Sequence, residues 1–260
     1  MASADEVTVR RITADDYEVV GDIHRRAFGL PTGPYREYVE NLCYSEPEGC
    51  LLALLRGEPV GYGCVHRAGS VGYLGPSGVL KEYRGRGIGK LLVEARAQYM
   101  SSRCRIVGLA TLPHQGGNIG RDLRCGFRET LPCREMVKAV RDGDGSVDRH
   151  SIVRGDELTV TQRQRFPSLV RGWTDRLLSG LDLTRDLERF LSRYSQHVFF
   201  YLDEGRPVAF IAQHDSFRGN TWFGVEPSDD DDLRLRQLLD VWEQAHAGRE
   251  VLLHFHTYSR

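Results

Sequence analysis

The residues with the clearest chemical potential are three glycines at alternate positions among basic side chains. The segment reads, in order, Arg84, Gly85, Arg86, Gly87, Ile88, Gly89 and Lys90. Glycines let the main chain approach a ligand closely. A helix that begins just beyond them presents unpaired N–H groups and the positive end of its dipole. The segment therefore predicts a site for a bound anion and suits a pyrophosphate.

Two other phosphate-binding loops do not match this segment. A Walker loop needs Ser or Thr after its Gly-Lys pair, whereas Leu91 follows Lys90, and Arg84 stands where its first glycine belongs. A dinucleotide-binding fingerprint needs a third glycine at position 90 or 92, which are Lys90 and Leu92. Nucleoside triphosphate and dinucleotide sites of these two kinds are therefore excluded.

A strand and a helix are expected to position the glycine segment. Residues 70–80 alternate as a strand does, and the helix that follows carries Ile88, Leu91, Leu92, Ala95 and Tyr99 on one face. Upstream we expect a strand at 7–12, a helix that begins near Thr13 and Asp16, a short helix at 35–42, and two strands joined across residues 56–59. Downstream we expect a strand at 105–111, a helical segment at 118–125 and closing strands at 127–140.

The sequence GVLKEYRGRGIGKLLV resembles the acetyl-CoA-binding motif of the GNAT family of N-acetyltransferases. Arg84, Gly87 and Gly89 occupy the three specified positions of its Gln/Arg-x-x-Gly-x-Gly/Ala signature. The preceding strand, the order of the opening elements and the Gly126-Phe127 pair also match. The resemblance covers about residues 6–140, and it implies an α/β fold with a mixed sheet that binds acetyl-CoA as acyl donor.

The resemblance also implies roles for individual residues. Backbone groups of Val79 and Leu80 would contact the acyl carbonyl and the pantetheine arm, where a splayed strand leaves them free. Main-chain amides from Arg84 through Lys90 would hold the pyrophosphate, with Arg84, Arg86 and Lys90 adding mobile positive charge. Asn118 would contact pantetheine, although the family asparagine more often lies nearer Gln115; a helix cap is the alternative role for Asn118.

The proton donor and the base are less clearly indicated. The family commonly places a tyrosine four residues before the glycine of Gly-Phe, and this sequence has Asp122 there, which is ionised at neutral pH unless burial raises its pKa. Tyr73 is a replacement candidate for the acid, with packing on the sheet as the alternative. His66 and His114 are candidates for the base that keeps an acceptor amine neutral; either could instead be a surface or capping residue.

Composition restricts the classes of protein further. Formal net charge is −1, which gives no global support for binding nucleic acid. No apolar run approaches the ~20 residues that cross a bilayer, and the N-terminal residues show no signal peptide, so we expect a cytoplasmic protein. The six cysteines, all within residues 1–133, show no zinc-site spacing. We therefore predict reduced thiols and no metal, and regard Cys125 as a packing residue.

A repeat relates the two halves of the chain. LLRGEPVGYGCVH and LDEGRPVAFIAQH align at a constant offset, which pairs Gly57 with Gly205, Pro59 with Pro207, Val60 with Val208 and His66 with His214. Gly78-Val79 and Gly224-Val225 follow at nearly the same offset. Helices are expected at 161–178, 184–194 and 230–245, and strands at 221–226 and 251–255.

The second copy lacks the glycine segment. Asp229–Asp232 lie at the expected helix start and would repel a pyrophosphate, so we predict no CoA site there. A solvated helix cap explains the aspartates better than a divalent metal site.

The sequence therefore predicts two tandem GNAT-like domains, the second truncated: an acetyl-CoA-binding domain at 1–140, a linker at 141–155 and a degenerate domain at 156–260. The expected reaction is direct transfer of an acetyl or other small acyl group from CoA to an amine of a small-molecule acceptor that enters between the halves. An aminoacyl-tRNA-dependent acyltransferase and a non-catalytic CoA-sensing scaffold remain alternatives. The chain is expected to be a monomer or homodimer that does not bind membranes.

Overall fold

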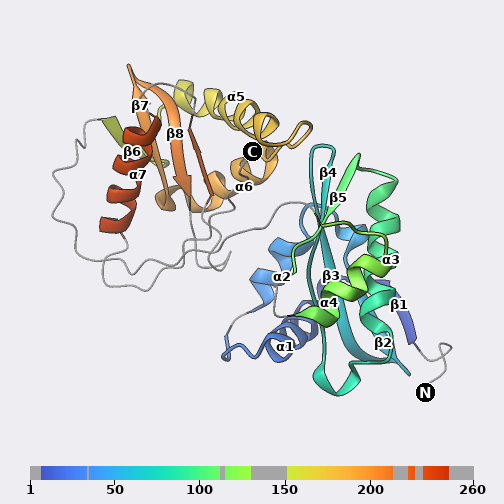
Figure 1. Cartoon of the computed structure of the whole chain (residues 1–260). Coiled ribbons are helices and arrows are strands. Elements are labelled where there is room, and N and C mark those ends of the chain that lie inside the picture. The colour runs from blue at the N-terminus through green and yellow to red at the C-terminus, as the bar shows by residue number, and fades with distance from the viewer. Residues whose placement is uncertain are drawn as a thin grey trace. The chain divides into compact units, whose positions relative to one another are not determined.

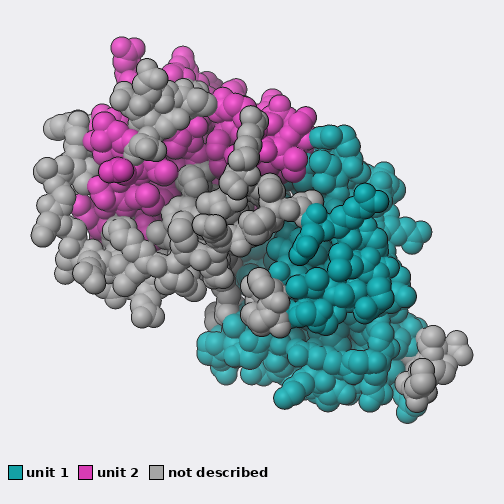
Figure 2. All heavy atoms as spheres, in the orientation of Figure 1, with its two compact units in different colours: residues 1–129 teal, residues 130–260 magenta. Residues whose placement is uncertain are grey.

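The computed structural model describes residues 7–33, 35–111, 115–129, 151–212, 222–225 and 231–245. The chain forms two compact units, residues 1–129 and residues 130–260 (Figure 2). Among the described residues, no helix combines the length and apolar character needed to span a bilayer.

The first unit is built on a mixed five-stranded sheet in the order β1-β2-β3-β4-β5. Strands β1 to β4 pair antiparallel, and β4 pairs with β5 in parallel. The strands are β1 (Val7–Arg11), β2 (Leu51–Leu55), β3 (Glu58–Ala68), β4 (Val71–Val79) and β5 (Ile106–Gly108). β5 is shorter than the strand predicted at 105–111.

Helices cover both faces of this sheet (Figure 1). On one face lie α1 (Tyr17–Phe28) and α2 (Tyr35–Cys43), and on the other lies α3 (Ile88–Ser101), with α4 (Gly116–Arg124) packed against it. The main-chain N–H of Thr13 donates to the Asp16 carboxylate at 2.8 Å just before α1, which confirms the predicted helix start. The apolar faces of α1, α2 and α3 pack against the sheet, so the strands are held from both sides.

A bulge changes the course of β4 midway. Gly63 pairs with Ser77 and Val65 pairs with Leu74, so β4 carries one more residue than β3 across this interval. β4 pairs with β5 only from Val71 to Tyr73. The part of β4 that follows the bulge thus runs on to the glycine segment without a described strand along its other edge.

The second unit contains a four-stranded antiparallel sheet in the order β6-β7-β8-β9. Its strands are β6 (Ile152–Arg154), β7 (Val198–Asp203), β8 (Arg206–Ala212) and β9 (Trp222–Val225). Helices α5 (Val160–Leu177) and α6 (Thr184–Tyr194) pack with Phe200 and Phe210, while α7 (Asp231–Ala245) packs with Phe199 and Ile211. Because neighbouring residues of a strand point to opposite faces, α7 lies across the sheet from α5 and α6 (Figure 1).

The hairpins β2–β3 and β7–β8 share their local geometry. Their turns place Arg56-Gly57 and Glu204-Gly205 at positive φ. Both contain a register shift at the following valine, Val60 or Val208, and the next strand pairs equivalently, with Tyr62 opposite Gly78 and Phe210 opposite Gly224. These features agree with the aligned repeat, while the idea that the second unit is a degenerate copy stays a prediction.

Some predicted elements differ from the structure or lie outside the described residues. Ile152–Arg154, inside the predicted linker, form β6, and Phe127–Glu129 are not a strand. Other predictions fall outside the described residues: the strand at 251–255, the position of His214, most of the linker and the rest of the closing strands.

Candidate functional site

The end of β4 offers fewer free backbone groups than predicted. The Leu80 N–H donates to the Val60 carbonyl at 3.0 Å, and the Leu80 carbonyl accepts from the Tyr83 N–H at 2.9 Å. The prediction that Leu80 is free for a ligand is therefore wrong. Val79 lies opposite Gly61. Because hydrogen-bonded and non-bonded pairs alternate in an antiparallel ladder, the backbone groups of Val79 point away from β3, toward the open edge.

The segment after β4 has a backbone that only glycine adopts easily. Gly85 and Gly87 have φ values of +78° and +82°, and beyond the chain neighbours no atom of the described residues lies within 4 Å of where a Cβ would stand on either residue. Gly87 is the N-cap of α3 and offers no side chain to the helix start. The segment is thus a bare main-chain turn with open space beside it.

The first turn of α3 presents unpaired amides. The Leu91 N–H is the first to find an acceptor within this turn, the Gly87 carbonyl at 3.0 Å. The preceding N–H groups of Ile88, Gly89 and Lys90 come before the start of the helical hydrogen-bond ladder. Together with the positive end of the helix dipole, they favour a bound anion.

Arg84 does not act as a mobile charge, contrary to the prediction. Its guanidinium donates to the Val79 carbonyl at 3.0 Å and to the Ala27 carbonyl at 2.9 Å. It therefore ties the start of the glycine turn to the end of β4 and to α1. It also occupies the Val79 carbonyl, so the Val79 N–H is the backbone group of that residue left for a ligand.

The other two basic side chains of the segment lie on the surface. The Arg86 guanidinium lies 5.8 Å from the centre of the Tyr83 ring. The Lys90 ammonium lies 3.6 Å from a carboxylate oxygen of Glu94, one helical turn further on. Such exposed contacts are weak, so both side chains can turn toward an anion held by the loop.

Asn118 is engaged within its own helix. Its Nδ2 donates to the Gln115 side chain at 2.5 Å, and its Oδ1 accepts from Arg121 at 3.2 Å. The N-cap of α4 is Gln115, so Asn118 is not the cap. An Asn118 contact with pantetheine would require these two hydrogen bonds to open.

Asp122 holds α4 in place and is not arranged as a proton donor. It is 4% exposed, and its carboxylate oxygens accept from the Thr111 hydroxyl and from the Arg121 guanidinium, each at 2.8 Å. Both carboxylate oxygens are thus engaged inside the domain, and neither is free to act on a ligand. The catalytic acid prediction for Asp122 is therefore wrong; it orients Arg121, whose guanidinium packs against Gly89.

Comparison with protein-family models decides the family of this unit. Residues 10–127 match the model of the acetyltransferase (GNAT) family. The chain contains a GNAT domain. The match spans the sheet, the glycine turn and α4, so the predicted family resemblance is confirmed for this part of the chain.

Several solved structures are similar to this chain in fold. A protein from Pyrococcus horikoshii described as a candidate acetyltransferase is 22% identical, with a TM-score of 0.70 over 97% of this chain and 81% of that chain. An aminoglycoside N-acetyltransferase in complex with CoA is 18% identical over 51% of this chain and 94% of its own, with a TM-score of 0.43. Another aminoglycoside acetyltransferase, from an uncultured soil sample, is 14% identical over 52% and 99%, also at 0.43.

Curated protein sequences give no match to this chain. The Pyrococcus likeness supports the α/β fold, because it spans nearly the whole chain. At 22% identity it carries no conclusion about substrate.

Tyr73 and His66 lie together in the GNAT domain where β4 and β5 separate. Tyr73 pairs in register with His66 on β3 and, as the last residue of the parallel pairing, with Gly108 on β5. Its side chain is 44% exposed, and its ring reaches along the strand over Gly75. His66 Nδ1 lies 2.9 Å from the Ser45 hydroxyl. His114 lies outside the described residues.

The sequence analysis missed a buried polar pair beneath α1 in the GNAT domain. His24 Nδ1 lies 2.5 Å from the Tyr62 hydroxyl, and the imidazole lies 4.8 Å from the ring centres of Phe28 and Tyr38. Burial raises the pKa of Tyr62 well above its usual value, so the phenol stays protonated. The signal available in the sequence was a histidine on the apolar face of α1.

A cavity of about 380 Å³ lies in the second unit. Its lining combines apolar side chains with an arginine and a glutamate, and comprises Ile152, Val153, Arg154, Glu157, Phe199, Val241 and Gln244. None of the residues predicted for the site lines it.

Proposed function

We propose that the GNAT domain binds acetyl-CoA and transfers its acetyl group, or another small acyl group, directly to an amine of a small-molecule acceptor. The diphosphate would bind the amides from Gly85 to Lys90, and the pantetheine arm would follow the open edge of β4. The observation that carries the proposal is the continuity of these two features along one stretch of chain.

The site fits this donor on two counts. A Cβ at Gly85 or Gly87 would occupy the open space beside the turn, and L side chains rarely adopt the positive φ found there. The unpaired amides at the start of α3 and the positive end of the helix dipole favour the negative charge of a diphosphate. When bound, acetyl-CoA supplies a thioester, which an amine can attack.

The chain would contribute positioning and proton transfer. The Val79 N–H is directed to the open edge, where it can donate to an acyl carbonyl oxygen and stabilise negative charge that develops there. Tyr73, exposed where β4 and β5 separate, is the proposed proton donor to the leaving sulfur. His66 is the described base candidate, and it would act on the acceptor amine directly or through water.

Calorimetry with acetyl-CoA, followed by a thiol-release assay over a panel of amines, tests this function. We expect saturable binding, and release of CoA thiol that depends on at least one amine. Gly87→Val should lose both, whereas Gly57→Val, at a matching φ of +87° in the β2–β3 turn, should retain both. Absence of acetyl-CoA binding in the unchanged chain would contradict the proposal, and RNase-sensitive activity would favour a tRNA donor.

A CoA-sensing role is the second candidate, and the arrangement of Asp122 favours it. At the position where the family usually carries a tyrosine, this chain has a carboxylate committed to Arg121 and Thr111. Tight binding of acetyl-CoA with no turnover on any amine would select this candidate over catalysis.

For the second unit we propose a structural role without a CoA site. This proposal rests on Asp229–Asp232, which replace the glycines and basic residues of the first unit in the aligned repeat. A binding stoichiometry of one acetyl-CoA per chain is the expected result, and two sites per chain would contradict it.

A further inference from the structure

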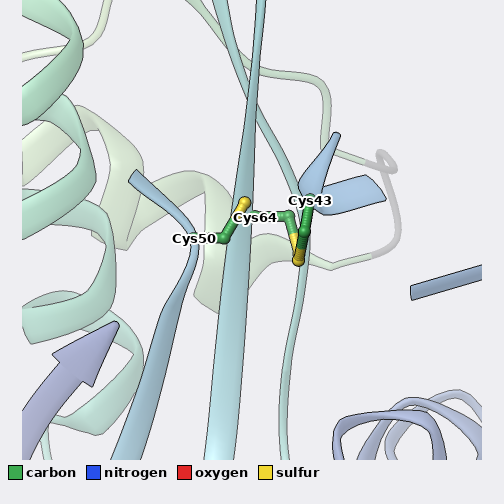
Figure 3. A group of neighbouring side chains, drawn as sticks. All are labelled: Cys43, Cys50 and Cys64. Carbon is green, nitrogen blue, oxygen red and sulfur yellow. The ribbon is translucent and has the colours of Figure 1, made fainter. Parts of the chain in front are cut away.

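Three cysteines that are distant in sequence meet in the core of the GNAT domain. Cys43 ends α2, Cys50 immediately precedes β2, and Cys64 lies on β3 (Figure 3). Their sulfur atoms all lie within 4.8 Å of one another. They are 3%, 0% and 0% exposed, respectively, and none forms a disulfide.

The cluster has a geometry close to that of a three-sulfur metal centre. Zinc–sulfur bonds of about 2.3 Å at tetrahedral angles place sulfur atoms roughly 3.8 Å apart. The three thiols therefore need to close by at most about 1 Å to share one ion. Cys50 is the residue across from Cys64 in the continued β2–β3 register, so β-sheet pairing already fixes two of the three sulfurs.

A buried cation lies against the main chain of Cys64, on the opposite face of the sheet from the Cys64 side chain. Arg96, on α3, is 1% exposed; its Nη1 donates to the Cys64 carbonyl at 2.8 Å and its Nε to the Leu92 carbonyl at 2.9 Å. No carboxylate pairs with it among the described residues, whereas nearby Arg121 has Asp122 as its partner.

The positive charge of Arg96 could balance the negative charge of a metal ion bound by the three cysteines. A buried cation without a carboxylate partner is costly in a protein interior, and the main-chain carbonyl of Cys64 accepts a hydrogen bond from Arg96. One divalent ion bound by three thiolates carries a net charge of −1. Together with Arg96, the centre would be neutral.

We propose that Cys43, Cys50 and Cys64 form a binding site for one thiophilic divalent d¹⁰ metal ion, of the zinc and cadmium class, whose tris-thiolate charge is balanced by Arg96. As three metal–sulfur bonds form, three S–H bonds break, and the three protons pass to solvent. No redox partner is required. Spacing along the chain does not indicate this site, because separations of 7 and 14 residues match no zinc pattern and the sheet brings the residues together.

Titration of the reduced full chain with Cd²⁺ tests the proposal independently of acetyl transfer. We expect thiolate-to-cadmium charge-transfer absorption that saturates at one Cd²⁺ per chain, after incubation long enough for the buried site to open. Cys64→Ala should reduce this absorption to background. Cys104→Ala and Cys125→Ala, which change cysteines outside the cluster, should leave it unchanged.

A charge variant and a stability measurement complete the test. Arg96→Met should weaken Cd²⁺ binding by roughly tenfold, because the complex would keep an unbalanced buried charge, while Arg103→Met, at an exposed arginine stacked on Tyr99, should not. Cd²⁺ should also raise the melting temperature of the unchanged chain and of Cys104→Ala equally. This measurement keeps the proposal testable if Cys64→Ala does not fold. Absorption that does not saturate in the unchanged chain, or that persists in folded Cys64→Ala, would overturn the proposal.

Discussion

The segments that follow β4 and β9 come after matching hairpins but carry opposite charge. In both units the strand pairs in the same register, with Gly78 opposite Tyr62 and Gly224 opposite Phe210. After β4, residues 81–90 contain three glycines, four basic residues and one acid. After β9, residues 226–232 contain five acids and no glycine. If the proposed function is correct, the connecting segment rather than the sheet geometry determines which unit binds an anion.

The packing beneath the two hairpins is similar in position but differs in polarity. A Cβ on Gly78 would meet Ala27 of α1 and the Tyr62 ring, and a Cβ on Gly224 would meet Trp173 of α5 and the Phe210 ring. Both units thus bring a helix close to the sheet at the corresponding strand position. In the first unit a polar tyrosine there bonds His24, whereas in the second unit a phenylalanine makes only apolar contacts.

The largest predicted effect comes from Gly87. Gly87→Val adds a side chain to the open turn at a φ of +82° and should weaken acetyl-CoA binding about a hundredfold, as expected when two main-chain hydrogen bonds of about 1.5 kcal/mol each are lost. Gly205→Val imposes a similar strain on the second unit, at a φ of +74°, and calorimetry should find its affinity unchanged. Equal losses in the two variants would remove the distinction between the units.

Loss of Asp122 should destabilise the first unit selectively. Asp122→Asn leaves the Arg121 charge without its partner and should lower the free energy of unfolding of that unit by about 2 kcal/mol. The three tryptophans lie at 173, 222 and 242, so their fluorescence reports on the second unit alone. In urea, we expect the far-ultraviolet circular dichroism transition to shift while the tryptophan transition stays in place.

If both transitions shift for Asp122→Asn, the two units unfold together, and the predicted selective loss of stability in the first unit is wrong.

A smaller effect is expected at Arg84, which ties β4, α1 and the glycine turn together. Arg84→Met removes two hydrogen bonds to main-chain carbonyls and should cost about 1 kcal/mol of stability. Arg86→Met removes an equal charge from the same turn without such bonds and serves as the matched control. A urea midpoint that falls more for Arg86→Met than for Arg84→Met would contradict the positioning role of Arg84.

The smallest effect is expected at Lys90. Lys90→Gln removes one exposed charge whose contact with Glu94 is 3.6 Å long, and it should weaken acetyl-CoA binding roughly twofold at low ionic strength. Raising the salt concentration should erase the difference, because the charge is screened. A loss of affinity as large as that of Gly87→Val would mean that side-chain charge, rather than the main chain, dominates the site.

Local patterns were sufficient to predict most of the fold and the location of the loop. Alternation along β4, the apolar face of α3 and the glycines at 85 and 87 each depend on neighbours close in sequence. Two of the wrong predictions depend on contacts between residues far apart in sequence: the Leu80 N–H bonds the Val60 carbonyl, and Arg84 bonds the Ala27 carbonyl. Asp122 is instead paired with its neighbour Arg121, and no local pattern indicates that the two side chains turn toward each other.

The buried histidine–tyrosine pair and the cysteine cluster also depend on contacts between residues far apart in sequence. His24 meets Tyr62, and Cys43 meets Cys64, only after α1 and α2 pack on β3. No spacing rule along the chain describes such contacts, because the sheet sets the distance between the residues.

A crystal structure of the full chain with CoA would show directly whether the glycine turn binds the diphosphate. We expect the diphosphate against the main-chain amides of residues 85–90, pantetheine along the open edge of β4 beside Val79, and no nucleotide in the second unit. A diphosphate bound at the start of α7, or bound in the first unit only by side chains while those amides stay unoccupied, would contradict this expectation.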